Sequence, residues 1–557
     1  HITSSQNGTT RFKSYLDKQS YYDVINNNQT FTEYITYDAY GNITEAKTTQ
    51  ASNGNIAGTQ TTTTTYTGAV SNPSGCDYLP DFTTTTYARP GEASISNSTQ
   101  YWWSADGKPW IEVAWRNTPK AVTTLYFDYN AFGTPLGISV SATGLDTRYS
   151  SATYDSKGRY PITKTDAMGW TLAMQYDHRT GQVTKATDIN GLTTLYQYDG
   201  FGRTRLTEFP DGLTLQQSMQ WDLNSTISNA CYYTTSTLIG SPPQKVWYDR
   251  LGREILAQSI DFAGQPVNAK TLYDTKGRLW KTSEPYADGT TATQFTLFDY
   301  DALGRNYQTT LPTGVKHVTN YAALSQNQIT TYASYGNDTW QTVTKTMNAF
   351  GEPVSITDQG GTIHYQYFSN GLPRSITANG STITMTYDLH GIRDTLIDPD
   401  AGLITTFYNN FDELTTQTDA RQNTYTMTYD KLGRMITRSG PYGELTSWDY
   451  ENTQAGKLGQ LNGVTMNNGT AQAYTYDVLG RLNTQTETTG SHEFTKTYSY
   501  DALGRLQNEY WHTGFGLNYQ YNTWGYMSQV TTPANQPVWQ AGSFNARGQA
   551  TSYNLGS

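Results

Sequence analysis

A six-residue phrase, Tyr-Asp-x-(Leu/Phe/Lys)-Gly-Arg, recurs along almost the whole of this 557-residue chain. Complete copies begin at Tyr154, Tyr198, Tyr248, Tyr273, Tyr300, Tyr429, Tyr476 and Tyr500. Looser copies, several of which have Asn in place of Asp, begin at Tyr37, Tyr129, Tyr176, Met347, Tyr387, Tyr521 and Phe544. Uninterrupted copies start 20 to 22 residues apart, and a period of this size is typical of a repeat architecture.

Each copy of the phrase predicts one β-hairpin. Asp at the first turn position can accept turn N–H groups, and Gly at the fourth position supplies the positive φ that closes the turn. The flanking residues alternate with a period of two, as in Thr194-Leu-Tyr-Gln-Tyr and Thr426-Met-Thr-Tyr, which favours strands. A second kind of turn, such as Thr187-Asp-Ile-Asn-Gly, joins one copy to the next. We therefore predict an all-β chain without helices, folded as a continuous antiparallel hairpin meander.

The number of copies predicts how this meander must behave. The recognisable copies give about 34 strands, which at ~4.8 Å each form a ribbon on the order of 160 Å wide. A twisted sheet of that width does not stay flat, and if it closes, its interior is too wide for side chains to fill. We expect the sheet to coil into a hollow spiral shell.

Composition narrows the class of protein. Charged residues are 15% of the chain, whereas Tyr and Gly number 45 and 49. We therefore expect hydroxyl and amide groups, rather than charges, to hydrate most of the surface. The net charge of −10 and pI near 5.2 argue against binding to nucleic-acid backbones. No apolar run approaches the ~20 residues of a membrane-spanning helix, and no signal-peptide pattern opens the chain. Because residue 1 is His rather than Met, we expect a segment or a processed product of a longer protein.

The regularity of the repeats divides the chain into three regions. Residues 1–119 are irregular, residues 120–450 hold the regular array, and residues 451–557 resume it after an Asn- and Gly-rich interruption. The two cysteines, Cys76 and Cys231, both lie in departures from the pattern. A disulfide between them and two free thiols are both compatible with the sequence.

The phrase, as it stands in Tyr198-Asp-Gly-Phe-Gly-Arg and Tyr500-Asp-Ala-Leu-Gly-Arg, resembles the YD repeat of Rhs proteins. The resemblance is strongest over residues 120–550 and extends to the B and C components of ABC-type bacterial toxin complexes. It implies a spiralling β-shell that encloses a toxic C-terminal polypeptide, and a secreted or cell-surface bacterial protein. The family's DPxGL-type signature has only an imperfect counterpart in Asp398-Pro-Asp-Ala-Gly-Leu, which we interpret as an ordinary repeat turn.

The repeated side chains are predicted to be structural, because a catalytic group is normally unique. Asp is expected to cap the turn, Arg to bond that carboxylate or nearby carbonyls, and Tyr to form a stacked aromatic ladder. A sugar-binding aromatic surface is the alternative for the tyrosines. We predict no catalytic, cofactor or metal site, and the seven histidines show no metal-ligand spacing. The representative turn residues are Tyr154, Asp155, Gly158, Arg159, Tyr198, Asp199, Gly202, Arg203, Tyr429, Asp430, Gly433, Arg434, Tyr500, Asp501, Gly504 and Arg505.

Three functions are weighed from these observations. The first is a non-enzymatic segment of a secreted bacterial toxin, forming a β-shell that shields a cargo polypeptide, with that effector or flanking Rhs segments as partners. The second is a surface adhesin or filament-forming protein that binds glycans or neighbouring subunits through exposed sheet edges. The third is a hydrolase with its site in the irregular stretches 205–245 or 450–470, for which no catalytic motif is present.

Overall fold

The computed structural model describes residues 17–23, 28–38, 41–52, 54–66, 79–223, 227–321 and 327–556. These residues form 46 β-strands and no helix, which confirms the predicted all-β fold. The expected number of about 34 strands was too low. Segments without a recognisable phrase, such as Asn55–Tyr66, also pair as strands. Cys76 and most of the Pro73–Pro80 loop lie outside the described residues, so a disulfide to the half-buried Cys231 and two free thiols both stay as alternatives.

The strands have the following bounds. The first twelve are β1 (Lys18–Asp23), β2 (Asn28–Tyr37), β3 (Ile43–Ser52), β4 (Asn55–Tyr66), β5 (Pro80–Ala88), β6 (Ile95–Trp103), β7 (Pro109–Ala114), β8 (Val122–Tyr129), β9 (Pro135–Ala142), β10 (Arg148–Tyr154), β11 (Pro161–Thr165) and β12 (Thr171–Tyr176). The next twelve are β13 (Val183–Thr187), β14 (Thr193–Tyr198), β15 (Thr204–Glu208), β16 (Thr214–Trp221), β17 (Tyr232–Leu238), β18 (Gln244–Tyr248), β19 (Glu254–Ile260), β20 (Pro266–Tyr273), β21 (Leu279–Ser283), β22 (Tyr286–Ala287), β23 (Phe295–Tyr300) and β24 (Asn306–Thr310). They are followed by β25 (Lys316–Asn320), β26 (Gln328–Tyr335), β27 (Asp338–Met347), β28 (Pro353–Asp358), β29 (Gly361–Tyr367), β30 (Pro373–Ala378), β31 (Ser381–Tyr387), β32 (Arg393–Asp398), β33 (Gly402–Tyr408), β34 (Leu414–Thr418), β35 (Thr424–Tyr429) and β36 (Met435–Ser439). The last ten are β37 (Leu445–Tyr450), β38 (Leu461–Met466), β39 (Thr470–Tyr476), β40 (Leu482–Thr489), β41 (His492–Tyr500), β42 (Leu506–Trp511), β43 (Gly516–Tyr521), β44 (Met527–Thr531), β45 (Pro537–Ala541) and β46 (Tyr553–Leu555).

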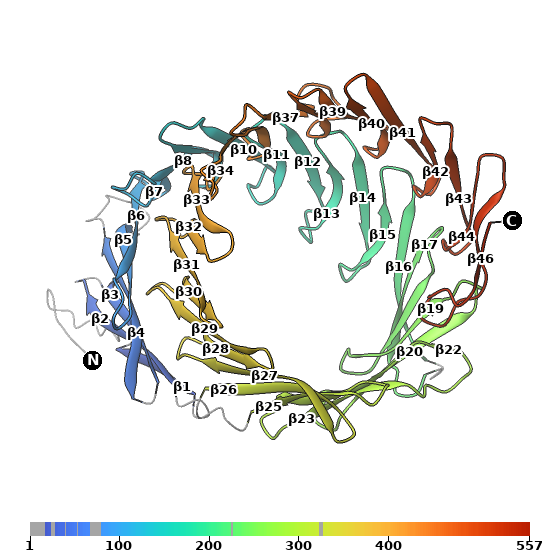
Figure 1. The fold of residues 1–557 in the computed structure, drawn as a ribbon, viewed down its shortest axis with the longest axis horizontal. Helices are drawn as coiled ribbons and strands as arrows, with labels where there is room; N and C mark the ends of the chain where they lie inside the picture. Colours follow the sequence, from blue (N-terminus) through green and yellow to red (C-terminus); the bar gives the residue numbers. More distant parts are fainter. Residues whose placement is uncertain are drawn as a thin grey trace. The chain divides into compact units, whose positions relative to one another are not determined.

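Within each unit most strands pair antiparallel with the next one along the chain, as the hairpin pattern predicts (Figure 1). The short β22 is an exception, because it pairs with β20 while β21 pairs with β23. The register shifts at the tyrosine of the phrase, for example between Gln197 and Tyr198 and between Ser499 and Tyr500. This β-bulge places one extra residue beside the turn and increases the local twist. The phrase therefore sets both the turn and the strand register at one edge of the sheet.

Contacts divide the chain into two compact units, each built from two separate stretches of sequence. Unit 1 comprises residues 1–151 and 318–443, and unit 2 comprises residues 152–317 and 444–557. In each unit we call the first stretch the early segment and the second the late segment. The three regions distinguished by repeat regularity (1–119, 120–450 and 451–557) describe a different property and stay a prediction.

The sheet is a single layer with a sparse core. Among the described residues only eight hydrophobic ones are buried, including Trp247, Leu256 and Met427. Cross-strand hydroxyl pairs supplement this small core, since threonines that flank the turns between copies face each other across the sheet. Thr187 and Thr193 are 2.9 Å apart between hydroxyl oxygens, and such pairs are worth roughly 0.2–1 kcal/mol each. Repetition makes these small contributions large in sum.

Candidate functional site

The turn of the phrase is a closed hydrogen-bond unit, shown here at Asp430. Its Oδ1 accepts the N–H groups of Leu432 at 2.9 Å and Arg434 at 3.0 Å, and its Oδ2 accepts Arg434 Nε at 2.7 Å. The Gly433 N–H donates to the Asp430 carbonyl at 3.0 Å. Gly433 has a φ of 79°, a conformation that costs most residues about 1–2 kcal/mol. The carboxylate thus serves the backbone and the guanidinium together.

The same aspartate–arginine pair recurs throughout the repeats. The nitrogen–oxygen distances are 2.6–2.7 Å at all of these pairs except the first, where the distance is 3.3 Å: Asp155–Arg159, Asp199–Arg203, Asp249–Arg253, Asp274–Arg278, Asp301–Arg305, Asp430–Arg434, Asp477–Arg481 and Asp501–Arg505. At Asp199 the Arg203 N–H and guanidinium hold the pKa of the carboxyl below its usual range. At Asp501 burial acts to raise the pKa, but the bonds from Arg505 outweigh it and the pKa is lowered.

In several copies the phrase tyrosine ties its hairpin to the one before it. The Tyr500 hydroxyl donates to the Leu482 carbonyl at 2.9 Å, and the Arg481 guanidinium lies 4.4 Å from the centre of the same ring. Tyr198 and Tyr429 donate in the same way to the carbonyls of Val183 and Leu414. Tyr154 ends β10, directly before its turn.

Many phrase tyrosines pack against an arginine side chain, where the sequence predicted stacking on another aromatic ring. Stacked tyrosine pairs do occur, as at Tyr160 and Tyr176, whose ring centres are 5.0 Å apart. The arrangement at Arg481 and Tyr500 instead recurs with centroid distances of 4.3–4.5 Å at Arg253–Tyr273, Arg278–Tyr300 and Arg505–Tyr521. The ladder is therefore largely one of arginine on tyrosine, a cation–π contact.

Two turns with Asn at the first position form a distinct variant. Asn348 and Asn409 keep the Oδ1 bonds to the turn N–H groups, but their Nδ2 groups donate to Glu352 at 2.7 Å and Glu413 at 2.6 Å. Glu replaces the usual Arg four residues after the Asn. The sequence carries the signal for this variant, because Asn and Glu replace Asp and Arg together in both copies.

The exchanged glutamates join the two segments of unit 1. Glu352 binds Arg89 through two bonds of 2.7 and 2.8 Å, and the Arg89 guanidinium lies 4.0 Å from the ring centre of Phe350. Glu413 pairs with Arg148, whose guanidinium lies 4.1 Å from the ring of Phe411. In each case an arginine of the early segment is held by an Asn-x-Phe-x-Glu turn of the late segment.

A third contact in unit 1 centres on His390, whose side chain is only 2% exposed. Its Nε2 lies 2.9 Å from the Lys120 carbonyl, its Nδ1 contacts the Asp412 carboxylate, and its ring is 4.0 Å from that of Trp115. Lys120 Nζ also lies 2.9 Å from Asp388 Oδ2. Here again a late phrase turn meets the early turn between β7 and β8.

Unit 2 has the same type of junction with different chemistry. The Tyr526 hydroxyl donates to the Ile260 carbonyl at 2.7 Å, and Asn522 Nδ2 donates to the Phe262 carbonyl at 2.9 Å. Trp524 fits against Gly264 so closely that a Cβ on that glycine would lie 2.8 Å from the indole nitrogen. The late phrase turn 522–526 is therefore seated on the early turn 261–265.

These contacts share one arrangement, which is described in terms of the two edges of each segment. The YD edge of a segment is the edge formed by its phrase turns, and the connecting edge is the edge formed by the turns between copies. In both units the YD edge of the late segment docks on the connecting edge of the early segment (Figure 1). The bonded residues are 260 to 270 positions apart in these four contacts.

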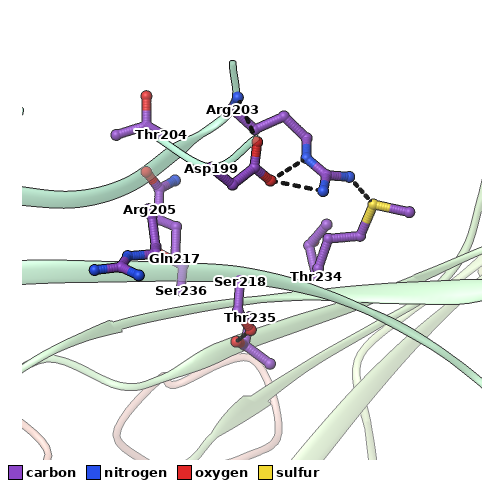
Figure 2. Close-up of a pocket in the computed structure, with 10 residues that line it drawn as sticks. Asp199, Arg203, Thr204, Arg205, Gln217, Ser218, Thr234, Thr235 and Ser236 are labelled. Atoms are coloured by element: carbon purple, nitrogen blue, oxygen red, sulfur yellow. Dashed lines mark hydrogen bonds and ion pairs between the residues drawn. The ribbon is translucent and has the colours of Figure 1, made fainter. Parts of the chain in front are cut away.

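A hollow of about 470 Å³ lies beside the turn Asp199–Arg203, over β15 to β17 (Figure 2). Arg203 contacts the Met219 sulfur, and its Nε donates to Asp199 Oδ2 at 2.6 Å. The Asp199 carboxylate and the Arg203 guanidinium are therefore paired with each other. None of the described lining residues is aromatic, which leaves no stacking surface for a sugar ring. The lining consists of Asp199, Arg203, Thr204, Arg205, Gln217, Ser218, Met219, Thr234, Thr235 and Ser236.

Neither a metal site nor a membrane-spanning helix is found in the part of the chain that the structure describes. No group of three or more His, Cys, Asp or Glu side chains there is arranged to hold a metal ion. No helix there is long and apolar enough to cross a bilayer. The phrase carboxylates are the most numerous candidate ligands, and they pair with the arginine of their own turn.

Comparison with known proteins defines the class. A family model described as RHS Repeat matches residues 178–214 and 408–445, which are two stretches of phrase-bearing hairpins. No curated protein sequence matches the chain. The chain thus carries RHS repeats in these two stretches.

Solved structures give the particular fold. The crystal structure of TcdB2-TccC3-TEV shares a TM-score of 0.75 and 12% identity over 94% of this chain. The Photorhabdus luminescens Tc holotoxin pore shares a TM-score of 0.72 and 13% identity over 97% of the chain. A further TcdB2-TccC3 crystal structure matches with a TM-score of 0.59 and 13% identity over 97% of the chain. The chain spans only 39%, 39% and 40% of the length of these three matched chains.

Proposed function

We propose that this chain is a wall segment of a secreted bacterial toxin complex, in which the repeat sheet encloses and shields a cargo polypeptide. The observation that carries the proposal is the fold shared with TcdB2-TccC3 over 94% of the chain. One similar structure is described as a Tc holotoxin pore. The proposed partners are an enclosed effector polypeptide and further Rhs segments.

The contacts explain how a single-layered sheet could act as a wall. Its backbone N–H and C=O groups are used in strand pairing, and proteases need mobile, unpaired backbone. Where two segments meet edge to edge, ion pairs such as Arg89–Glu352 close the seam. The sheet's hydroxyl-rich, weakly charged surface would hold a cargo without binding it tightly.

The proposal assigns no reaction to the chain. The carboxylates and guanidinium groups of Asp155, Asp199, Asp430 and Asp501 and their arginine partners are engaged in turns. We therefore infer a structural role for the sixteen representative residues of the phrase. Glycan binding and adhesion gain no support from the hollow at Asp199, which has no aromatic residue among its described lining.

Protease protection tests the proposal. A protease-sensitive reporter polypeptide is expressed as a fusion to the chain and its digestion is compared with that of the free reporter. We expect at least tenfold slower digestion of the fused reporter. A matched variant with Arg89→Ala and Arg148→Ala, which loosens the seam in unit 1, should lose part of the protection. Digestion at the free rate while the sheet stays folded would contradict the proposal.

A further inference from the structure

Three phrase turns on the YD edge of the early segment in unit 2 expose large apolar side chains, and the turn that carries Lys276 stands between the last two. Phe201, Leu251 and Leu303 occupy the position before the turn glycine, and they are 88%, 76% and 63% exposed. Soluble monomers rarely keep such side chains in contact with water when they are arranged in a series. The turns themselves do not need them, because Lys157 and Lys276 occupy the same position in other copies.

The same position is covered in the late segment of unit 2. Leu479, Leu503 and Trp524 are all half-buried. Leu503 contacts Gly240 and Trp524 contacts Gly264, both of which belong to connecting turns of the early segment. The apolar residue of the phrase is therefore the side chain that inserts into a neighbouring connecting edge.

The complementary surface is also exposed to solvent on this chain. The connecting turns of the late segment in unit 2, at residues 467–469, 490–493, 512–515 and 533–536, are exposed throughout. Phe494, directly after the second of these turns, and Phe515, within the third, are 44% and 51% exposed. In the early segment the corresponding edge bears Phe262, and there Phe544 of the late segment stacks on it at 4.4 Å between ring centres.

We propose that the exposed YD edge of unit 2 is a docking surface for a second copy of this chain, which presents the connecting edge of its late segment. The proposal goes beyond enclosure of a cargo. Both halves of the interface are present on one chain, and the rule that joins them is already used inside each unit. Because the two surfaces differ, the contact is head-to-tail, and such contacts generate closed rings or open-ended rows of subunits.

Sedimentation velocity over a range of concentrations tests the proposal. The unmodified chain should form dimers and longer species as its concentration rises. The YD-edge variant Phe201→Ser, Leu251→Ser, Leu303→Ser should stay monomeric, because it lacks the inserting side chains. A control variant, Phe407→Ser, changes a residue of β33 that is 62% exposed and should associate like the unmodified chain.

Mixing two variants gives the sharper test. The connecting-edge variant Phe494→Ser, Phe515→Ser should also be monomeric by itself. Mixed with the YD-edge variant, it should form a one-to-one pair that grows no further, since each partner retains one intact surface. Three results would each overturn the proposal: a chain that is monomeric at every concentration, association that persists in the YD-edge variant, and mixtures that stay monomeric. Persistence in that variant would point instead to pairing between strand edges.

Discussion

Arg89 and Glu352 are 263 residues apart in sequence, yet their side chains form two hydrogen bonds of 2.7 and 2.8 Å. The arginine side chain is 11% exposed and the glutamate 20%. Burial acts to raise the pKa of Glu352, but the bonds from Arg89 and Asn348 outweigh it and the pKa is lowered. This pair is the clearest case of the edge-to-edge junction that holds the two segments of unit 1 together.

Replacing Glu352 with Gln should destabilise the protein by about 2 kcal/mol, between the cost of an exposed ion pair and that of a fully buried one. The loss follows because Arg89 stays partly buried without its charged partner. Urea unfolding measures it. The matched control is Glu33→Gln, which breaks an exposed pair with Lys18 (41% and 47% exposed) and should change the free energy of unfolding by less than about 0.5 kcal/mol. Equal effects of the two substitutions would contradict the role given to the junction.

Two substitutions at Asp430 should separate its two roles. Asp430→Ala removes the acceptor of two turn N–H groups and should cost about 1–2 kcal/mol. Asp430→Asn keeps an Oδ1 acceptor and loses only the charged bond to Arg434, so it should cost less than half as much. The turns at Asn348 and Asn409 show that an amide can hold this geometry. Thermal unfolding compares the two variants, and an Asn variant as unstable as the Ala variant would refute the division.

A pair of glycines tests the junction in unit 2. Gly264 and Gly212 both have a φ of 82°, so an alanine strains the backbone equally at both, by roughly 1–2 kcal/mol. A Cβ at Gly212 meets nothing within 4 Å, whereas one at Gly264 lies 2.8 Å from the Trp524 indole nitrogen. Gly264→Ala should therefore lower the unfolding midpoint in urea more than Gly212→Ala does. A second variant, Trp524→Ala in the Gly264→Ala background, should lose much of this extra penalty.

Tyr500 offers two separable contacts. Tyr500→Phe removes the hydroxyl bond to the Leu482 carbonyl and should cost about 1 kcal/mol, while it keeps the ring under Arg481. Tyr500→Leu removes both contacts and should cost more. Equilibrium unfolding of the two variants measures the difference. If the two costs are the same, the arginine-on-tyrosine contact contributes nothing to stability.

Stability should fall at both ends of the pH range. The pKa values of Asp199 and Asp501 are lowered in the folded state, so their contribution is present above the unfolded value near 4 and is lost as the pH falls through the folded values. Burial raises the pKa of Tyr500, and burial with the Glu509 carboxylate raises that of Tyr519 to about 12. The tyrosine contribution is therefore present below the unfolded value near 10 and is lost as the pH rises further. Melting temperatures measured from pH 2 to pH 12 should show a plateau between these limits, and a flat profile into strong acid would be inconsistent with it.

The amino-acid sequence is sufficient to specify the hairpin and its turn. Asp430 and Gly433 occupy the first and fourth positions of one turn, and their hydrogen-bond partners lie within five residues. Local interactions are therefore sufficient to specify this turn. Repetition then favours the antiparallel order, because a short turn brings each strand beside the next one along the chain. The strand count was less predictable, since stretches such as Asn55–Tyr66 lack the phrase and pair only because adjacent strands offer an edge.

Packing between segments distant in sequence determines which copies of the phrase meet another segment. Phe350 and Phe201 occupy the same turn position, but Phe350 lies under Arg89 whereas Phe201 is 88% exposed. The phenylalanine and its place in the turn are the same in both copies, and the difference in exposure depends on a residue more than 250 positions away. The exchange of Arg for Glu at residue 352 marks one such junction in the sequence. Its meaning becomes clear only when the fold brings Arg89 opposite it, because pairing of distant charges depends on how the sheet packs against itself.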